Sequence, residues 1–309
     1  DHLRRGSMRL DAVKTVVLDE ADEMLRMGFI DDVEWILDHA PKERQTAVFS
    51  ATMPPQIRRI AERYLNDPVN MSITHRVVTQ PTIEQRFLSV NVRHKFDALV
   101  RVLETERSEA VIIFSRTKTG AQELAEKLGA RGYAAEAMHG DMNQVHRESV
   151  IRRLKSGRLE VVVATDVAAR GLDVDHITHV INYDIPHDPE SYVHRIGRTG
   201  RAGRSGVAVL LVTPRERRMM RLIEQYTKKQ LVPMKIPTNA QVAERRTTVF
   251  KETLVKAVGE GGLDHYKTLI QQWSEELEID PLTLAAAGAK LASQDRPLEA
   301  EPEQELEPS

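Results

Sequence analysis

Short apolar runs rich in β-branched residues recur along the chain, and amphipathic stretches separate them. Each run is continuous rather than alternating and is bounded by polar or turn residues, which is typical of strands buried on both faces of a parallel sheet. The runs are Thr15–Leu18, Thr46–Phe49, Val111–Phe114, Val161–Ala164, Val180–Asn182 and Val207–Val212. Helical patterns such as Gly120–Arg131 and Val145–Ser156 lie between them. The pattern therefore predicts an α/β fold built from βαβ units.

Two stretches break this pattern and indicate domain boundaries. Between Pro68 and Gln85, prolines alternate with β-branched and polar residues, which is typical of a linker. From about Leu231 the α/β pattern stops at Pro233 and Pro237, and helical patterns follow. The three predicted helices are 245–259, 263–277 and 282–291.

We therefore divide the chain into five parts. Two are α/β domains, and the others are a linker, a helical region and an acidic tail that has too few apolar residues to fold. The bounds are 1–73 for the first α/β domain, 74–82 for the linker, 83–230 for the second α/β domain, 231–292 for the helical region and 293–309 for the disordered tail.

Composition narrows the class of protein. The 309 residues are 41% hydrophobic and 29% charged, as in soluble globular proteins, and no apolar run approaches the roughly 20 residues that span a bilayer. The absence of cysteine excludes disulfides and thiolate metal or redox sites, and we expect a cytoplasmic location. The net charge is −2, but carboxylates gather in residues 295–309 against Arg296 alone, so the remainder is mildly basic. A basic body with an acidic end fits a nucleic-acid binder, as well as many other proteins.

Polar residues follow several of the predicted strands directly. The first group is Asp19-Glu20-Ala21-Asp22, and carboxylates at the carboxyl end of a parallel strand point into the crevice where α/β sheets bind ligands. Such an aspartate can hold Mg²⁺ through water, and a neighbouring glutamate can activate an attacking water. A solvated acidic turn that opens a helix explains these four residues equally well.

Three further groups occupy similar positions. Ser50-Ala51-Thr52 ends the next strand, where a simple turn is the favoured interpretation of the group alone. Residues 165–173 follow a strand of the second domain. Residues 194–201 (HRIGRTGR) space several arginines with glycines, and such arginines are costly to bury unless they meet anions. Guanidinium groups suit phosphate oxygens, so a phosphate site is favoured here over a basic surface patch.

Taken in order, these groups resemble the motifs of DEAD-box ATP-dependent RNA helicases. The matching segments are VLDEADEML, SATMP, VIIFSRTK, HGDMNQVHRESVIRRLKSG, VVATDVAARGLDV and NYDIPHDPESYVHRIGRTGRAG. The segments QPTIEQRF and PRERRMMRLIEQ look most like the bacterial DeaD (CsdA) cold-shock branch, and this resemblance extends to about residue 292. It implies an α/β fold of two RecA-like parallel-sheet domains, the first incomplete, followed by a small all-α region.

The resemblance implies roles around ATP and Mg²⁺, the expected cofactors. Asp19 would hold Mg²⁺, Glu20 would act on the attacking water, and Asp173 would bind the ribose of ATP. Arg198 and Arg201 would reach the γ-phosphate, with Arg201 as the arginine finger that stabilises the charge of phosphoryl transfer.

It also implies residues that couple ATP to RNA. Asp22 would pair with Ser50, Thr52 and His194 and so link the two ligands. Another set would touch the RNA sugar–phosphate backbone, which positions RNA without reading its sequence. These residues are Arg116, Gly140, Gln144, Arg147 and Thr165.

The chain departs from the family pattern upstream of Asp19. No G-x-x-x-x-G-K-[ST] loop, whose backbone N–H groups and lysine cradle phosphates, occurs in the sequence. Because the chain also begins at Asp1 rather than at Met, we expect a fragment that lacks this Walker A loop and is inactive alone. The parent protein would couple ATP hydrolysis to local unwinding of short RNA duplexes, in ribosome assembly, RNA decay or cold adaptation.

Two alternatives belong to other classes. A non-enzymatic RNA-binding or scaffolding module would explain a missing phosphate loop beside an intact second domain. The sequences of the DEAD, SAT and HRIGRTGR motifs argue against a processive translocating helicase. Residues 240–292 resemble the dimerisation region of the DeaD branch, so we expect a homodimer, with helix packing inside one chain as the alternative.

Overall fold

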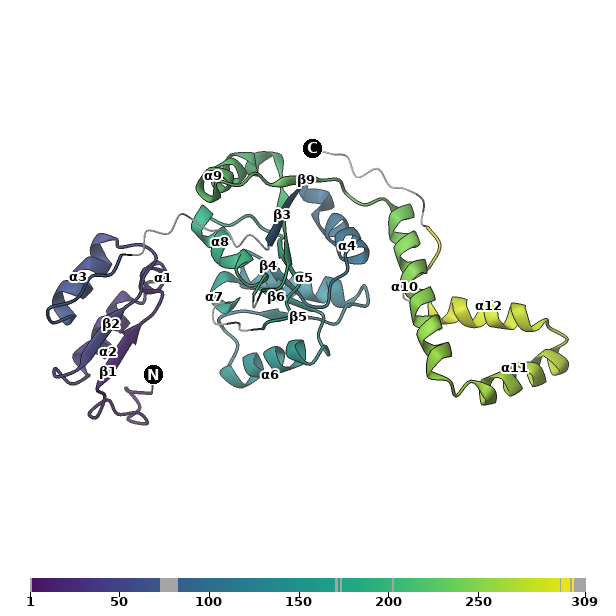
Figure 1. The fold of residues 1–309 in the computed structure, drawn as a ribbon, viewed down its shortest axis with the longest axis horizontal. Helices are drawn as coiled ribbons and strands as arrows, with labels where there is room; N and C mark the ends of the chain where they lie inside the picture. Colours follow the sequence, from purple (N-terminus) through teal and green to yellow (C-terminus); the bar gives the residue numbers. More distant parts are fainter. Residues whose placement is uncertain are drawn as a thin grey trace. The chain divides into compact units, whose positions relative to one another are not determined.

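The chain divides into two compact units, Asp1–Thr74 and His75–Ser309 (Figure 1). The computed structural model describes residues 2–72, 83–169, 172, 174–201, 203–294, 296–300 and 302. The predicted linker, residues 74–82, lies outside the described residues. Each unit is described by itself below.

The first unit is a two-stranded parallel sheet with three helices. Its elements are β1 (Thr15–Leu18), α1 (Ala21–Arg26), α2 (Ile30–Asp38), β2 (Gln45–Val48) and α3 (Pro55–Tyr64). The strands pair in parallel from Thr15 opposite Gln45 to Leu18 opposite Val48. The predicted first strand is confirmed, and the second begins and ends one residue earlier than the predicted 46–49.

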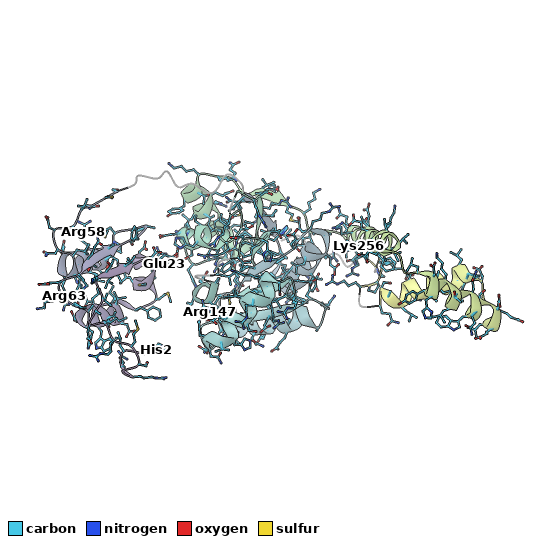
Figure 2. The ribbon with its side chains drawn as sticks, turned by 60° about the horizontal axis from the view of Figure 1, so that its bottom comes forward. His2, Glu23, Arg58, Arg63, Arg147 and Lys256 are labelled. Atoms are coloured by element: carbon cyan, nitrogen blue, oxygen red, sulfur yellow. The ribbon has the colours of Figure 1, made fainter. Side chains whose placement is uncertain are left out.

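The core of the first unit lies between its sheet and its helices. Leu18, Leu37 and Ile57 are buried there and pack together. Arg63 on α3, labelled in Figure 2, reaches α2 and lies 3.4 Å from the carboxylate of Glu34. The contact is partly solvated, so it adds little to the stability that the apolar core supplies.

The second unit contains a seven-stranded sheet in which every pair of strands is parallel, in the order β5-β6-β4-β7-β8-β3-β9. The strands are β3 (Ile83–Ser89), β4 (Val111–Phe114), β5 (Ala135–Met138), β6 (Val161–Ala164), β7 (His179–Asn182), β8 (Gly206–Val212) and β9 (Val232–Met234). The crossover elements are η1 (Val92–His94), α4 (Lys95–Thr105), α5 (Lys118–Gly129), α6 (Gln144–Lys155), α7 (Asp166–Ala169), α8 (Pro189–Ile196), η2 (Pro214–Glu216) and α9 (Arg217–Thr227).

Alternate residues of the central strands enter different cores. Ile113 and Val163 pack with α4 and α5 on one face, while Ile112 and Val162 pack with α6 and α7 on the other. All four side chains are fully buried. Coverage of both faces explains why these strands are continuously apolar, and it confirms the predicted βαβ architecture.

Three strands carry weaker signals and were not predicted. In β3, exposed Glu84 stands between buried Ile83 and Gln85, and β5 has only the short sequence AEAM. Strand β9 contains Pro233, which has no N–H to donate but is tolerated because β9 lies at the edge of the sheet. The α/β section therefore extends through Met234 instead of changing at Leu231.

Three helices follow the sheet, as predicted: α10 (Asn239–Glu260), α11 (Asp264–Leu277) and α12 (Pro281–Ala292). Helix α10 starts before the predicted residue 245 because Thr238 and Gln241 form a capping box. The Arg246 guanidinium of α10 donates two 3.1 Å hydrogen bonds to the carboxylate of Glu104 on α4. This pair ties the first half of α10 to the sheet domain.

Part of the predicted disordered tail, residues 293–309, contacts the sheet domain and α10. The Arg296 guanidinium lies 4.7 Å from the ring centre of Tyr133 and donates to the carbonyl of Gly132 at 3.3 Å. Arg246 donates to the carbonyl of Pro297 at 3.1 Å. Residues 303–309 lie outside the described residues.

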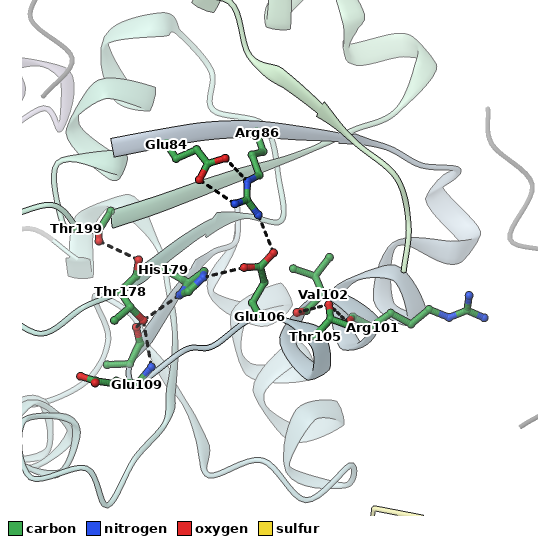
Figure 3. A network of polar contacts seen from close by, with 11 residues as sticks. Glu84, Arg86, Arg101, Val102, Thr105, Glu106, Glu109, Thr178, His179 and Thr199 are labelled. Atoms are coloured by element: carbon green, nitrogen blue, oxygen red, sulfur yellow. Dashed lines mark hydrogen bonds and ion pairs between the residues drawn. The ribbon is translucent and has the colours of Figure 1, made fainter. Parts of the chain in front are cut away.

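A polar network joins β3, β7 and the end of α4 (Figure 3). Glu106 accepts from Arg86 at 2.8 Å and lies 3.5 Å from His179 Nε2, and Glu84 also pairs with Arg86. The hydrogen bond with His179 is the main reason that the pKa of Glu106 lies below its ordinary value, although burial opposes it. The network thus depends on an ionised Glu106.

None of the described helices is both long enough and apolar enough to cross a bilayer.

Replacing Glu106 by Ala should lower the free energy of unfolding at neutral pH by about 2 to 3 kcal/mol, because nearly buried His179 and Arg86 would lose their acid. Since the pKa of Glu106 is depressed, its contribution is present above about pH 4.3 and disappears as pH falls through the lower folded value. Urea unfolding followed by circular dichroism at several pH values measures this.

Glu109→Ala is the matched control, because Glu109 contacts Thr178 through its backbone N–H. An equal loss of stability in both variants, or a Glu106→Ala effect that stays constant as the pH is lowered through the acid range, would contradict the assigned network.

Candidate functional site

The carboxyl end of β1 presents two exposed carboxylates. Asp19 Oδ1 accepts a 2.9 Å hydrogen bond from the backbone N–H of Glu20, and both residues are exposed. Glu20 precedes α1 in a left-handed conformation, φ 51° and ψ 45°, which is uncommon for a residue with a side chain. Backbone strain of this kind clusters at functional sites. Asp19 keeps carboxylate oxygen available, and oxygen is the ligand that Mg²⁺ prefers.

Asp22 is a buried acceptor that joins α1 to the end of β2. Its Oδ2 accepts from the backbone N–H of Thr52 at 2.7 Å and from the Thr52 hydroxyl at 2.8 Å. Ser50 Oγ accepts from the Asp22 backbone N–H at 3.1 Å and donates to the Thr52 carbonyl at 2.6 Å. Burial raises the pKa of Asp22, but the hydrogen bonds from Thr52 and Ser50 outweigh it and hold the pKa below its ordinary value. The structure therefore brings together Asp22, Ser50 and Thr52, as predicted.

In the second unit, three predicted RNA-contact residues follow adjacent strands. Gly140 comes after β5, Thr165 after β6 and Arg116 after β4, and these strands are neighbours in the sheet. Neighbouring strands lie about 4.8 Å apart, so the three positions form one row along the carboxyl edge. Gln144 and Arg147 lie in the first turn of α6, beside Gly140.

Hydrogen bonds orient two of these side chains. Arg147, labelled in Figure 2, is half-buried and donates to the carbonyl of Ala168 at 2.6 Å. Gln144 is exposed and donates to Glu148 at 2.8 Å. The backbone N–H of Arg116 donates to Asp184 at 2.9 Å, and its half-exposed side chain lies 3.9 Å from the carboxylate of Glu216.

The arginines expected at phosphate lie just after α8. Arg198 Nε donates to the His194 carbonyl at 3.4 Å, and Arg201 Nε donates to the Gly197 carbonyl at 2.9 Å. Buried Thr199 fixes the loop between them, since its hydroxyl donates to the Ile177 carbonyl at 2.6 Å. Asp173 lies outside the described residues. The predicted pairing of Asp22 with His194 joins the two units and stays a prediction.

Arg195 is the residue whose role sequence reasoning missed. Its side chain is 2% exposed and donates two hydrogen bonds to Asp166, at 2.6 and 2.8 Å. It also donates to Asn182 Oδ1 at 3.1 Å and to the Asp184 carbonyl at 2.7 Å, and it lies over the ring of Phe114. One guanidinium therefore connects α8 with the ends of β4, β6 and β7.

The sequence carried a partial signal for this cluster. Asp166 and Asp184 follow strands, as the first-unit carboxylates do, and the three arginines of the HRIGRTGR segment are close enough in sequence to need different partners. Asp184 accepts from the Ser115 hydroxyl at 3.2 Å and from the Lys95 ammonium at 3.4 Å. The strand-end carboxylates Asp166 and Asp184 thus pair with cationic side chains of the same unit.

Replacing Arg195 by Ala should lower the free energy of unfolding of the second unit by about 3 kcal/mol, because Asp166 and Asn182 would lose a buried partner. Arg195→Lys should recover only part of this, since an ammonium cannot make the bidentate pair. Urea unfolding monitored by circular dichroism gives both values. Exposed Arg204 provides the control variant Arg204→Ala; a loss in the control that equals the loss in Arg195→Ala would disprove the role.

Three family models match the chain. They are the DEAD/DEAH box helicase model over residues 1–60, the helicase conserved C-terminal domain over 94–203 and the RNA helicase DeaD dimerization domain over 237–303. The matches cover most of the first unit, most of the sheet domain and the terminal helices.

Curated relatives agree with these models. The DEAD-box ATP-dependent RNA helicase CshA of Geobacillus kaustophilus is 51% identical over 96% of this chain and 63% of its own length. CshA of Bacillus subtilis is 50% identical over 96% of this chain and 59% of its own length. The chain therefore spans about three fifths of the length of these relatives.

A solved structure supports the same fold. S. cerevisiae Dbp5 bound to RNA and ADP BeF3 superimposes with a TM-score of 0.69 at 33% identity, over 76% of this chain and 63% of the Dbp5 chain. The two RecA-like parts and the terminal helical region agree with the architecture predicted from the sequence. With the ordered strand-end motifs, the family models and the relatives in agreement, this chain belongs to the DEAD-box RNA helicase family.

Proposed function

We propose that the whole protein is an RNA-stimulated ATPase that locally unwinds short RNA duplexes. The observation that carries the proposal is the Asp22–Ser50–Thr52 network, a buried carboxylate that joins the acidic motif to the next strand end. Such a network can sense a ligand at the exposed carboxylates beside it. The relatives, named ATP-dependent RNA helicases, support the same assignment.

Residues of both units would serve ATP. Asp19 would hold Mg²⁺, which neutralises phosphate charge when bound, and Glu20 would accept a proton from the attacking water. Arg198 and Arg201 would stabilise the charge that develops on the transferred phosphoryl group, with Arg201 as the finger. Asp173 would bind the ribose hydroxyls. The strained backbone and exposed carboxylate of Glu20 are consistent with a residue that contacts substrate once it binds.

The carboxyl edge of the second unit's sheet would bind RNA by contacting the sugar–phosphate backbone of the RNA. Polar and cationic groups lie there in one row, and hydroxyl contacts would distinguish RNA from DNA. The set is Arg116, Gly140, Gln144, Arg147 and Thr165. Pairing of Asp22 with His194 would then link RNA binding to ATP hydrolysis.

In the whole protein, Glu20→Gln should reduce RNA-stimulated ATP turnover by about 10²–10⁴-fold, the usual contribution of a general base. Binding of a fluorescent ATP analogue should be retained, because the amide keeps the shape of the side chain. The matched control is Glu43→Gln, an exposed acid of the same unit. Wild-type turnover in the Glu20 variant would refute the assigned role, and RNA binding without any turnover in the unmodified whole protein would identify a scaffolding module instead.

We also propose that residues 240–292 form a homodimer interface. Helices α11 and α12 contain no buried residue within the described chain, although they carry large apolar side chains. Exposed apolar patches larger than a few hundred Å² mark interaction sites in soluble proteins. The exposed set is Val249, Leu254, Val255, Val258, Tyr266, Trp273, Leu277, Ile279, Leu282 and Leu291. The match to the DeaD dimerization domain supports this surface as the interface.

Light scattering of the purified chain should give twice the 35.0 kDa mass of one copy. The double variant Val255→Glu/Val258→Glu should give a monomer, because two carboxylates cannot be desolvated in an apolar interface without partners. The variant Lys256→Glu/Glu260→Lys on the same helix exchanges the charges of a surface ion pair and should stay dimeric. A monomeric unmodified chain at high concentration would contradict the proposal.

The setting of this activity is proposed from the family alone. A cytoplasmic protein acting in ribosome assembly, RNA decay or cold adaptation agrees with its bacterial relatives and with the dimerization-domain match. An increase in transcript and protein after a shift to low temperature would support the cold-shock role, and constant levels would count against it.

A further inference from the structure

Helix α9 carries a strongly cationic surface that the proposed ATP and RNA sites do not use. Residues 213–229 contain six basic residues and only two acidic ones, within a chain whose net charge is −2. Five of the basic side chains are exposed. They are Arg215, Arg217, Arg218, Arg221 and Lys228. Positive charge is therefore concentrated on one element.

The exposed cations of α9 lie opposite its buried face. Ile223 and Thr227 point into the core. At about 100° per residue, Arg217, Arg218 and Arg221 fall within roughly one third of the helix circumference, on the far side, and Lys228 follows the last turn as the C-cap. Like charges three and four residues apart, as in Arg218 and Arg221 or Arg217 and Arg221, repel each other and destabilise a helix. Packing of the helix does not require this arrangement.

The two acids of this segment do not neutralise the surface. Glu216 Oε2 accepts from the N–H and the hydroxyl of Thr213, at 2.9 and 2.8 Å, and thereby caps η2. Glu224 accepts from the backbone N–H of Leu231 at 3.0 Å. Both carboxylates are engaged at the helix flank.

Four of the cations have no acid partner of their own. Within the part of the chain that the structure describes, the side chains of Arg215, Arg218, Arg221 and Lys228 make no ion pair. Their charge is therefore available to an external anion.

The cationic helix continues the row of proposed RNA contacts. Along the carboxyl edge, the sheet order places Gly140, Thr165 and Arg116 after β5, β6 and β4, and β7 and β8 come next. Strand β8 leads directly into η2 and α9. Arg116, the last proposed contact, lies 3.9 Å from Glu216 at the start of α9. Two strand spacings, about 10 Å, separate the ends of β4 and β8.

We propose that the exposed face of α9 is a second contact surface for the RNA backbone, which extends the bound strand beyond the end of β4. The inference rests on the proposed function of the β5–β6–β4 edge, from which the track continues. Guanidinium forks and a lysine ammonium would bind successive phosphates without reading sequence. Displacement of counterions from those phosphates would make binding through α9 depend steeply on salt.

The test uses the chain with residues Arg218, Arg221 and Lys228 all changed to Gln. Binding of a fluorescent single-stranded oligouridylate of about twenty nucleotides is followed by anisotropy over a series of salt concentrations. Each phosphate contact on a single strand contributes about 0.7 to the slope of log affinity against log salt, so the slope should fall by about 2. The affinity at about 0.1 M salt should fall at least about tenfold.

A matched variant removes the same charge elsewhere. Lys42, Lys155 and Lys235 are exposed and lie outside both α9 and residues 240–292, and changing all three to Gln should leave the slope unchanged. The double variant Arg218→Lys/Arg221→Lys keeps the charge and should retain most of the binding, which separates loss of contact from loss of folding. An equal loss in both Gln triple variants, or competition by polyglutamate as effective as that by unlabelled RNA, would overturn the proposal.

The proposed edge is tested in parallel through the double variant Arg116→Gln/Arg147→Gln. If this variant loses RNA binding and the α9 triple variant does not, the result supports the proposed contacts at the edge and contradicts the proposed α9 surface. If only the α9 triple variant loses RNA binding, the result supports the α9 surface and contradicts the proposed contacts at the edge. Absence of RNA binding by the unmodified chain at low salt contradicts both.

Discussion

The second unit depends on one buried guanidinium. Arg195 is almost completely removed from water, and an unpaired charge there would be prohibitively costly, so its hydrogen bonds to Asp166, Asn182 and the Asp184 carbonyl are a condition of folding. These partners follow or end three different strands. The positions of the strand-end loops and of α8 are consequently not independent. Helix α8, which precedes the arginines proposed to meet phosphate, and the strand-end loops proposed to contact RNA are thus joined in one layer.

The first unit solves the same problem with the opposite charge. Buried Asp22 is ionised and accepts from the backbone N–H of Glu23 in α1 and from Thr52 after β2, much as Asp184 accepts from Arg116 after β4 and from Lys95 in α4. In both units the exposed groups stand next to the buried one, as Asp19 and Glu20 do beside Asp22. Rigid internal pairs thus hold exposed side chains in place, and only the exposed ones remain free for ligands.

The sequence predicted the central strands well because their residues are buried on both faces, so a continuous apolar run leaves little ambiguity. Strand β4, from Val111 to Phe114, and strand β6 were located to the residue. Strands β3 and β5 carry Glu, Gln and Arg, and only pairing with their neighbours makes them strands. The candidate site residues were predicted from motif order, which places Arg195 among the arginines expected at phosphate. Its burial depends on Asp166, which is distant in sequence and is brought near only by the fold.

If the Arg195 guanidinium links the loops at the carboxyl edge, the backbone amide hydrogen bonds of these loops should break in one cooperative opening. Native-state hydrogen exchange of the second unit measures this directly at three positions: Arg116, bonded to Asp184; Ala169, bonded to Thr165; and Arg198, bonded to Arg195. We expect a single opening free energy and a common denaturant dependence for all three amides. Three separate opening energies, with the Arg198 amide exchanging independently of the other two, would contradict it.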